Sequence, residues 1–431
     1  MTNLKFLTAT AEPALLDLPW QLPLENWPED RIAALPKGIS RHTVRFVKLD
    51  DHVIAIKETL FDLAKREYEM LRELEKLEVP CVEPFAIVSN RETENGEELP
   101  AVLITRHLKY SLPYRAMWSQ GIKEQTAKRL VDALAVLLVR LHLIGFFWGD
   151  VSLSNTLFRR DAGAFAAYLV DAETGQLYES RLSNGQRAND LEIARVNIAG
   201  ELMDLVASGK AQDVDPIAIS QRIVDKYNTL WTELTEVQSF SGEERFRIAQ
   251  RVRRLNELGF DIEEMRMESV AGGAELKIQP KVVDAGHHQR RLIRLTGLDV
   301  EENQARRLLN QIDEFALRAG DVEDEEMIAH QWLSQIFEPV VNAVPRELRG
   351  KLENAELFHE VLDHQWRLAN EQKRDVELLE AVQSYVDEVL VNRRDESAYL
   401  GTTTEMITLP NPIPSGEVVV DEEEGDWRDL V

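Results

Sequence analysis

Cysteine is almost absent from this sequence of 431 residues, in which Cys81 is the single thiol. One thiol cannot form a disulfide within the chain and cannot supply a cysteine-rich metal site, so the composition indicates a reducing compartment. Apolar runs long enough to cross a bilayer are also missing. Residues 1–20 lack the basic and apolar regions of a secretory signal peptide. We therefore expect a cytoplasmic protein with no membrane span.

Positive charge is the second scarcity. The formal net charge is −26 at pH 7, with 50 Lys and Arg against 76 Asp and Glu. Nucleic-acid-binding proteins need a basic surface that displaces counterions from phosphates, so this charge argues against such a role, although a local basic patch would still be compatible with it. Hydrophobic residues at 44% and charged residues at 29% are typical of globular proteins. The length predicts two or three domains.

The stretch around which the chain is organised is HLIGFFWGDVSLSNTLF, residues 142–158. It ends a helix predicted over residues 124–144 and turns at Gly149. Asp150 and Asn155 then follow in the spacing D-x-x-x-x-N, just before a short apolar strand. Because Asp and Asn are common in ordinary turns, the interpretation depends on the residues on either side.

A predicted antiparallel hairpin over residues 41–58 carries the first of these residues. Its two-residue period places Ala55 and Lys57 on one face. The helical pattern of residues 61–77 places Glu67 on the apolar stripe. A carboxylate that faces a core needs a cation, so we predict that Glu67 pairs with Lys57. Taken alone, Lys57 would be better explained as the solvated end of an edge strand.

Two further apolar strands are predicted nearby. The run PAVLITRHL contains Thr105 and ends at Leu108. The run FAAYLV is followed by Asp171. Both runs would also suit ordinary buried strands. An acid directly after a buried strand suits a hard cation that prefers oxygen ligands, and the distance of Asp171 after Asn155 favours this interpretation.

Five residues occur in the order of the catalytic parts of a protein kinase, each in a suitable strand, helix or loop: Lys57, Glu67, Asp150, Asn155 and Asp171. Residues 35–237 thus resemble a protein-kinase-like phosphotransferase. Their sequence pattern is most similar to the lipopolysaccharide-kinase and aminoglycoside-phosphotransferase branches. The later half of the chain resembles a bacterial domain of unknown function that follows such kinase-like domains.

The resemblance implies an α+β fold. A two-lobed kinase-like domain is expected over residues 1–238, with the first lobe ending at about residue 106. A mainly helical α+β domain is expected over residues 239–400. The acidic tail, residues 401–431, has too little apolar content to order itself, and it could serve as a recognition segment for a protein partner.

The resemblance also implies transfer of phosphate from ATP, with Mg²⁺, to a hydroxyl of an unidentified acceptor. Asp150 would be the catalytic residue that accepts or orients this hydroxyl, while Asn155 and Asp171 would hold the metal. Lys57, positioned by Glu67, would bind the phosphates. Six further residues would contact the nucleotide, three at the adenine and three at the phosphates: Ala55, Thr105 and Leu108, and Gly38, Ser40 and Arg41.

Several positions depart from the kinase pattern. Trp148 and Gly149 replace the His-Arg of H-R-D, and Ser152 stands where a phosphate-binding lysine is common. Ala172 and Glu173 follow the metal-binding aspartate in place of Phe-Gly. These departures leave open a nucleotide-binding pseudokinase that serves as a protein-interaction module. A helical interaction protein without nucleotide is a third alternative.

One basic cluster stands out in the later half: His287, His288, Arg290, Arg291 and Arg294. A solvated helix face that pairs with nearby acids explains it best, and a docking site for an anionic ligand or partner is the alternative. We predict that Gly297 ends this helix and that Asp299 and Glu302 form a capping box for the next one.

Overall fold

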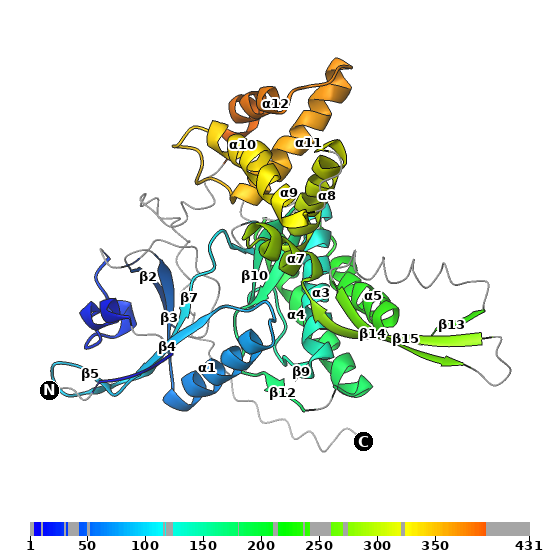
Figure 1. The fold of residues 1–431 in the computed structure, drawn as a ribbon. Helices are drawn as coiled ribbons and strands as arrows, with labels where there is room; N and C mark the ends of the chain where they lie inside the picture. The colour runs from blue at the N-terminus through cyan, green and yellow to red at the C-terminus, as the bar shows by residue number, and fades with distance from the viewer. Residues whose placement is uncertain are drawn as a thin grey trace. The chain divides into compact units, whose positions relative to one another are not determined.

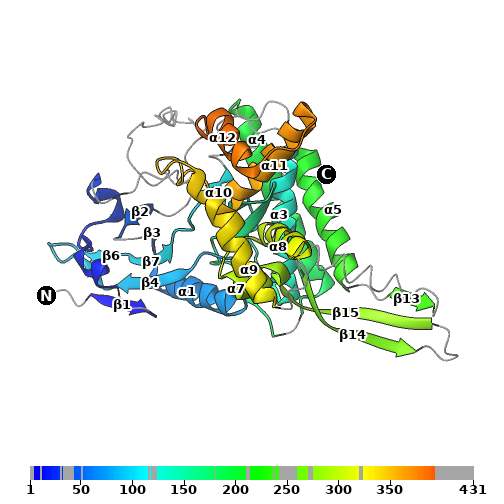
Figure 2. The same cartoon turned by 45° about the horizontal axis from the view of Figure 1, so that its top comes forward.

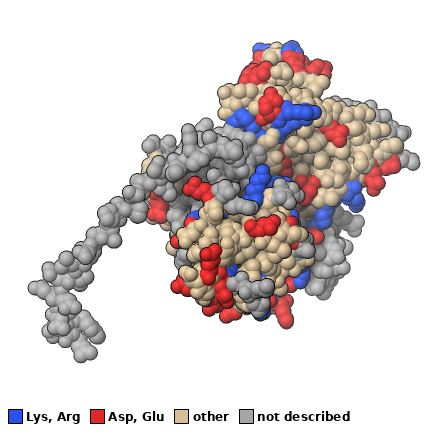
Figure 3. All heavy atoms as spheres, turned by 90° about the vertical axis from the view of Figure 1, so that its left-hand side faces the viewer, with Lys and Arg blue, Asp and Glu red and all other residues tan. Residues whose placement is uncertain are grey.

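The computed structural model describes residues 4–9, 12–29, 32, 43–49, 52–114, 117, 124–179, 181–209, 214–235, 238–241, 260–269, 275–319 and 324–393. Met1–Gly401 form one compact unit, which contains all the described residues. The predicted tail lies outside the described residues, as do Gly38, Ser40 and Arg41. Every helix in the described ranges is too short or too polar to cross a membrane. Figure 3 shows acidic and basic side chains interspersed on one face.

A five-stranded antiparallel sheet forms the first part of the chain (Figure 1). In spatial order its strands are β1 (Lys5–Thr8), β4 (Pro84–Ser89), β7 (Ala101–Arg106), β3 (Val53–Thr59) and β2 (Val44–Lys48). The predicted hairpin is confirmed as β2 and β3, in which Val44 lies opposite Lys57. From the sequence no strand is predicted before residue 41, and the structure adds β1, which pairs with β4.

The two faces of this sheet are covered by different elements. Helix α1 (Phe61–Lys76) packs on one face, where its Ala64 and Tyr68 cluster with Ile87 and Leu103. The other face is covered by the segment that contains the 3₁₀ turns η1 (Pro13–Asp17) and η2 (Leu24–Asn26). Trp20 and Trp27 are buried there with ring centroids 5.3 Å apart. Two short strands, β5 (Arg91–Glu92) and β6 (Glu98–Leu99), pair outside the sheet.

The next part of the chain is mainly helical (Figure 2). Its helices are α3 (Glu124–Leu143), α4 (Asn184–Ala207) and α5 (Pro216–Thr235). Its strands are β8 (Leu112–Pro113), β9 (Phe146–Phe147), β10 (Thr156–Asp161), β11 (Ala164–Leu169) and β12 (Gln176–Leu177). Strand β9 precedes the loop that carries Asp150, and β12 follows the loop that carries Asp171. Because β9 and β12 pair with each other, the two loops are brought together.

The later half combines strands and helices, which confirms the predicted α+β class. The strands are β13 (Gln238–Ser241), β14 (Phe260–Ser269) and β15 (Glu275–Ala285). The helices and π-helical turns are α7 (His287–Thr296), α8 (Glu302–Ala319), α9 (Glu325–Trp332), η4 (Leu333–Phe337), α10 (Glu338–Ala343), α11 (Asn354–Gln372), α12 (Leu378–Tyr385) and η5 (Val386–Leu390). These helices share a second hydrophobic core around Trp332, Phe337 and Phe358. The division at residue 238 stays a prediction.

Gly297 ends α7 with φ +75°, as predicted. The predicted capping box is wrong, because α8 begins only at Glu302. The Glu302 carboxylate instead accepts hydrogen bonds from the backbone N–H groups of His288 and Gln289, so it caps the start of α7.

The basic side chains of α7 are engaged by acids. Arg291 lies 2.6 Å from Glu325 and 3.4 Å from Asp313. Arg290 lies 3.5 Å from Glu78. These ion pairs favour the interpretation of the α7 cluster as a solvated, acid-paired face.

Buried polar side chains join β10 to the helices of the later half. We call Arg159, Asp161, Glu301, Gln304 and Glu356 the junction network. The Arg159 guanidinium lies 3.0 Å from Glu301 and 2.7 Å from Glu353. The Glu301 carboxylate also accepts a hydrogen bond of 2.7 Å from the Tyr168 hydroxyl.

The second half of the junction network surrounds Asp161. Its carboxylate accepts hydrogen bonds from Asn303 Nδ2 at 2.7 Å and from Gln304 N at 2.8 Å. Glu356 Oε2 accepts from Ala162 N at 3.0 Å and from Gln304 Nε2 at 3.1 Å. Since a buried polar group is costly unless it is hydrogen-bonded, this network fixes the position of β10 against α8 and α11.

Candidate active site

Lys57 lies at the centre of a cluster of carboxylates. Its Nζ is 2.9 Å from Glu67 Oε2, 3.0 Å from Asp171 Oδ2 and 3.2 Å from Glu173 Oε2. Strand β3 supplies the lysine, α1 supplies Glu67, and the loop after β11 supplies the other two acids. The predicted pair of Lys57 and Glu67 is therefore present. Glu173, which the sequence analysis noted only as a departure, joins it.

The electrostatics of this cluster follow from three acids around one ammonium group. Burial alone would lower the pKa of Lys57, but the charges of Glu67 and Asp171 outweigh it and raise this pKa above its ordinary value. Burial, reinforced by the charge of Asp171, raises the pKa of Glu67 to about 7 even though Lys57 acts in the opposite direction. The cluster thus carries more negative charge than Lys57 neutralises, and it would accept a further cation.

Asp150 and Asn155 are bonded within one loop. Asn155 Nδ2 donates to Asp150 O and to Asp150 Oδ2, both at 3.0 Å. The amide oxygen of Asn155 is left to accept or to ligate. Because Val170 N donates to Asn155 O at 3.1 Å, Asn155 and the neighbouring Asp171 lie at the same end of the β10–β11 hairpin. The two predicted metal ligands are therefore brought together.

Trp148 and Gly149 connect the two loops. The buried Trp148 indole N–H donates to Asp171 O at 2.8 Å, and Thr174 Oγ1 donates to Trp148 O at 2.8 Å. Gly149 has φ +79°, in the left-handed region, and an added Cβ would stand 3.1 Å from the Phe147 ring. Glycine at this position therefore follows from the turn itself, whereas the kinase pattern has arginine.

Helix α4 holds the Asp150 loop from behind, through residues that sequence reasoning missed. The fully buried Asp190 carboxylate accepts hydrogen bonds from Trp148 N and Gly149 N, both at 2.8 Å. It also lies 3.1 Å from His142 Nε2. His142 is packed in the core, and burial lowers its pKa.

Two more α4 side chains complete this support. Asn197 Nδ2 donates to Val151 O at 3.1 Å and lies 3.4 Å from Asp150 Oδ1. Glu201 accepts hydrogen bonds from Leu153 N at 2.8 Å and from Ser154 N at 2.9 Å. Asp190, Asn197 and Glu201 are spaced by seven and four residues, which is one face of a helix. The signal that could have identified them is a row of polar residues at this spacing on a helix that also has buried apolar residues.

Ser152 serves the turn. It is buried, and its Oγ accepts a hydrogen bond from Asn155 N at 3.1 Å. Its carbonyl accepts from Thr156 Oγ1 at 2.7 Å. This position therefore supplies a hydroxyl that shapes the loop, where many kinases supply a cation.

The residues predicted to contact adenine lie on neighbouring strands. Ala55 of β3 is paired directly with Thr105 of β7, and Leu108 follows at the end of β7. His107, which lies between Thr105 and Leu108 in the sequence, packs edge-on against Phe46, with ring centroids 5.6 Å apart. Burial lowers the pKa of His107 to about 4, so its ring is neutral at physiological pH.

Two protein-family models match parts of the chain. Residues 61–198 match the model of the lipopolysaccharide kinase (Kdo/WaaP) family, and residues 229–390 match a domain of unknown function, DUF4032. The chain joins a kinase-like region to this domain of unknown function. That order is the one predicted from the sequence.

Among the solved structures that match is one described as WaaP in complex with acyl carrier protein. It has a TM-score of 0.34 and 14% sequence identity, and the match covers 59% of this chain and 99% of that chain. These values are too low for a comparison of individual residues. A search of curated proteins found no significant match.

Proposed function

We propose that the chain is an ATP- and Mg²⁺-dependent phosphotransferase that acts on a hydroxyl of a small-molecule, glycan or protein acceptor. The observation that carries this proposal is the position of Lys57 Nζ, 2.9 Å from Glu67 and 3.0 Å from Asp171. In kinases the equivalent lysine binds the α and β phosphates, beside the aspartate that holds the metal on those phosphates. A cation and a metal ligand at this distance support the same arrangement here.

The donor atoms suit magnesium. Asp171 and Asn155 offer carboxylate and amide oxygens, which hard divalent cations prefer. The ligating atoms of Glu67, Asp171 and Glu173 lie within 4.8 Å of one another, and Lys57 pairs with all three. A bound Mg²⁺ would neutralise charge on the transferred phosphate. We infer that Asp171 and Asn155 would hold it, and that Glu173 is close enough to assist.

The remaining nucleotide contacts would come from the first part of the chain. Lys57 would exchange its bonds to Asp171 and Glu173 for phosphate oxygens while Glu67 keeps its ammonium in place. Ala55, Thr105 and Leu108 would face the adenine. Gly38, Ser40 and Arg41 would cover the phosphates.

Asp150 would act on the acceptor. Hydrogen bonds from Asn155 to Oδ2 and from Asn197 to Oδ1 orient its carboxylate. The acceptor hydroxyl would give its proton to Asp150 as its oxygen bonds to the γ-phosphorus. The bond between that phosphorus and the β–γ bridging oxygen would break, and ADP would leave.

A second candidate is a nucleotide-binding pseudokinase. It is favoured by Ser152, whose hydroxyl replaces an expected cation and is used within the loop. The two candidates differ in what Asp150 does, because a pseudokinase needs nucleotide binding without transfer.

The test compares the wild type with Asp150→Asn at saturating Mg·ATP. We expect phosphate transfer, or slow ATP hydrolysis, to fall by about a hundredfold or more in the variant, since general-base and positioning roles have this size. Nucleotide affinity should stay unchanged because Asn155 and Asp171 remain. Equal rates in the two proteins, with normal nucleotide binding, would refute the enzyme and establish the pseudokinase.

A further inference from the structure

A cavity of about 640 Å³ lies away from the Lys57 cluster, between the kinase-like region and the later half. Its wall comes from the start of α3, the turn between β10 and β11, and helices α11 and α12 with η5. The volume falls within the range of small-molecule sites. We call it the junction cavity. The lining residues that matter here are Arg129, Arg160, Phe165, His359, Trp366 and Arg367.

His359 presents an unsatisfied polar atom in this wall. The residue is only 5% exposed, and its Nδ1 has no hydrogen-bond partner in the described part of the chain. Its Nε2 lies 3.5 Å from Asp363 Oδ2, which favours a proton on Nε2 and leaves Nδ1 as an acceptor. Burial lowers the pKa of His359, so the ring is neutral. Nδ1 is itself enclosed by protein, so the ring adds a neutral surface to the wall and no charge.

The acids of the wall are already engaged by the protein. Glu356 accepts hydrogen bonds from Gln304 of the junction network and from Ala162 in the turn between β10 and β11. Glu360 is bonded to the Tyr385 hydroxyl and to Arg393. Asp363, the most exposed of these acids, pairs with Arg307. Their capacity to attract a cationic ligand is therefore low.

Two arginines of the wall, Arg129 and Arg367, are less fully used by the residues that the structure describes. Arg129 is exposed and forms no hydrogen bond or ion pair with any residue that the structure describes. Arg367 Nη2 donates to the ring of His364 at 2.8 Å, and its carboxylate neighbours Glu371 and Glu388 are 4.0 and 3.8 Å away. Together with Arg160 they place three guanidinium groups around the cavity of a chain whose net charge is −26. An anion is the ligand that this arrangement attracts.

Aromatic side chains supply an apolar wall. Trp366 is 72% exposed even though it is one of the largest apolar side chains, and Phe165 and Tyr385 line the same cavity. A tryptophan left this exposed at a concave site is suited to pack against a flat or apolar ligand group.

We propose that the junction cavity binds a small phosphate ester with an aromatic or apolar part. Arg129 and Arg367, from α3 and α11, hold the phosphate together with Arg160. Three guanidiniums on separate elements fit a tetrahedral dianion better than a planar carboxylate. Phe165 and Trp366 pack against the apolar part. The site is separate from the nucleotide site proposed above.

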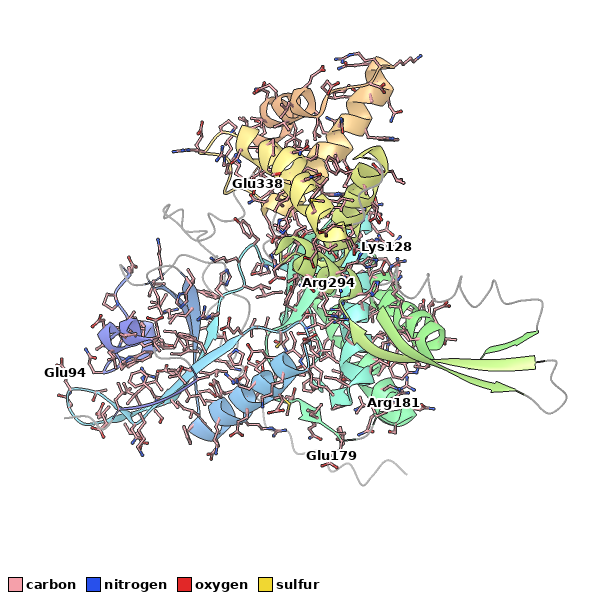
Figure 4. All side chains as sticks on the ribbon, viewed as in Figure 1. Glu94, Lys128, Glu179, Arg181, Arg294 and Glu338 are labelled. Atoms are coloured by element: carbon pink, nitrogen blue, oxygen red, sulfur yellow. The ribbon has the colours of Figure 1, made fainter. Side chains whose placement is uncertain are left out.

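Calorimetric titration of the full chain with 1-naphthyl phosphate and with pyrophosphate tests the proposal. We expect 1-naphthyl phosphate to bind, and Arg129→Gln to raise its Kd at least tenfold. Arg129 is exposed, so this change leaves the fold intact. The matched control is Lys128→Gln, one residue earlier on α3, where the lysine pairs with Glu124 outside the cavity (Figure 4); its Kd should stay within twofold of the wild type.

Further titrations distinguish binding in the junction cavity from binding at other sites. Lys57→Met should leave the Kd unchanged, whereas Ala164→Trp, which fills the cavity, should abolish binding. The analogues 1-naphthol and 1-naphthoate should bind at least tenfold more weakly than the phosphate. The proposal is overturned if 1-naphthyl phosphate does not bind at millimolar concentration, if pyrophosphate binds as tightly as 1-naphthyl phosphate, if Arg129→Gln and Lys128→Gln behave alike, if Lys57→Met abolishes binding, or if the analogues bind as tightly.

Discussion

Lys57 Nζ and Glu67 Oε2 lie 2.9 Å apart, although one residue comes from a strand of the sheet and the other from the helix that covers it. This pair sets the position of the ammonium group, so we expect Lys57→Met and Glu67→Gln to weaken nucleotide binding non-additively. The coupling energy should be about 0.5–3 kcal/mol, as for residues in direct contact. Calorimetric Kd values for Mg·ATP in the wild type, the two single variants and the double variant give this energy.

The control cycle uses Lys65 and Glu69 on the same helix. Their charged groups are 3.9 Å apart and half or more exposed. Neither substitution should change nucleotide affinity, because an exposed pair contributes little. Additive losses in the Lys57 and Glu67 cycle would show that the two side chains act separately.

Asp171 should govern stabilisation by nucleotide. If the proposed nucleotide site is correct, Mg·ATP at a hundred times its Kd should stabilise the folded state by about 2.7 kcal/mol and raise the melting temperature accordingly. Asp171→Asn removes the carboxylate proposed to hold the metal, so most of this rise should vanish. Differential scanning fluorimetry with Mg·ATP, with ATP in EDTA and without ligand measures it. A full rise in the variant would contradict the metal role of Asp171.

Asp190 should act as a positioning residue. Its carboxylate accepts the N–H groups of Trp148 and Gly149, and asparagine would offer only one oxygen to them. We expect Asp190→Asn to lower the free energy of unfolding by about 2 kcal/mol, the size of a lost hydrogen bond to a charged group. Phosphate transfer should fall more than affinity for Mg·ATP does, because the Asp150 loop moves while Lys57 stays.

Glu192→Gln provides the control on the same helix. Glu192 is exposed and pairs with Arg195, so urea unfolding should give a value within about 0.5 kcal/mol of the wild type. If Asp190→Asn lowered kcat and nucleotide affinity to the same extent, the positioning role would be wrong.

The stability of the protein should depend on pH through Glu356. Burial raises its pKa to about 7 from an ordinary value of 4.5. The unfolded chain releases this proton near pH 4.5 and the folded chain near pH 7, so the folded state binds more protons between these values. The free energy of unfolding should therefore fall as the pH rises through this window, by about 1–3 kcal/mol from this residue.

Glu356→Gln should reduce that dependence, because the amide oxygen can still accept from Ala162 and Gln304 without becoming charged. Urea unfolding at pH 5 and pH 8 measures the difference between the two proteins. Glu338→Gln, on the exposed side of α10 (Figure 4), should follow the wild type. An unchanged slope in Glu356→Gln would show that Glu356 does not hold its proton in this range.

Part of the site could be predicted because the periodicity of one strand and one helix determines which way its side chains face. The alternation of β3 set the face of Lys57, and the helical stripe of α1 made Glu67 a buried acid that needed a partner. Asp150 and Asn155 share one loop, so their spacing in the sequence already limits their separation in space.

The rest depends on contacts between distant segments. Asp190 bonds to backbone amides about forty residues earlier, and backbone amides leave no mark in the sequence. Glu173 differs from solvated acids only because β9 and β12 bring its loop to Lys57. Strand β1 is four residues long and becomes a strand by pairing with β4, which is about eighty residues away. Glu302 fits a capping box by spacing, but it caps the helix that precedes it.

Strand β10 belongs to both parts of the chain at once. Asn155 stands just before its first residue, and Asp161, its last, is bonded to α8. Six residues of strand span about 20 Å, so a side chain of the later half and a proposed metal ligand are held by one stiff ribbon. During evolution, a substitution at Asp161 or Gln304 needs a compensating substitution on the other side of the junction network. A recombined gene that acquired a new kinase-like segment would therefore have to acquire suitable α8 and α11 residues with it.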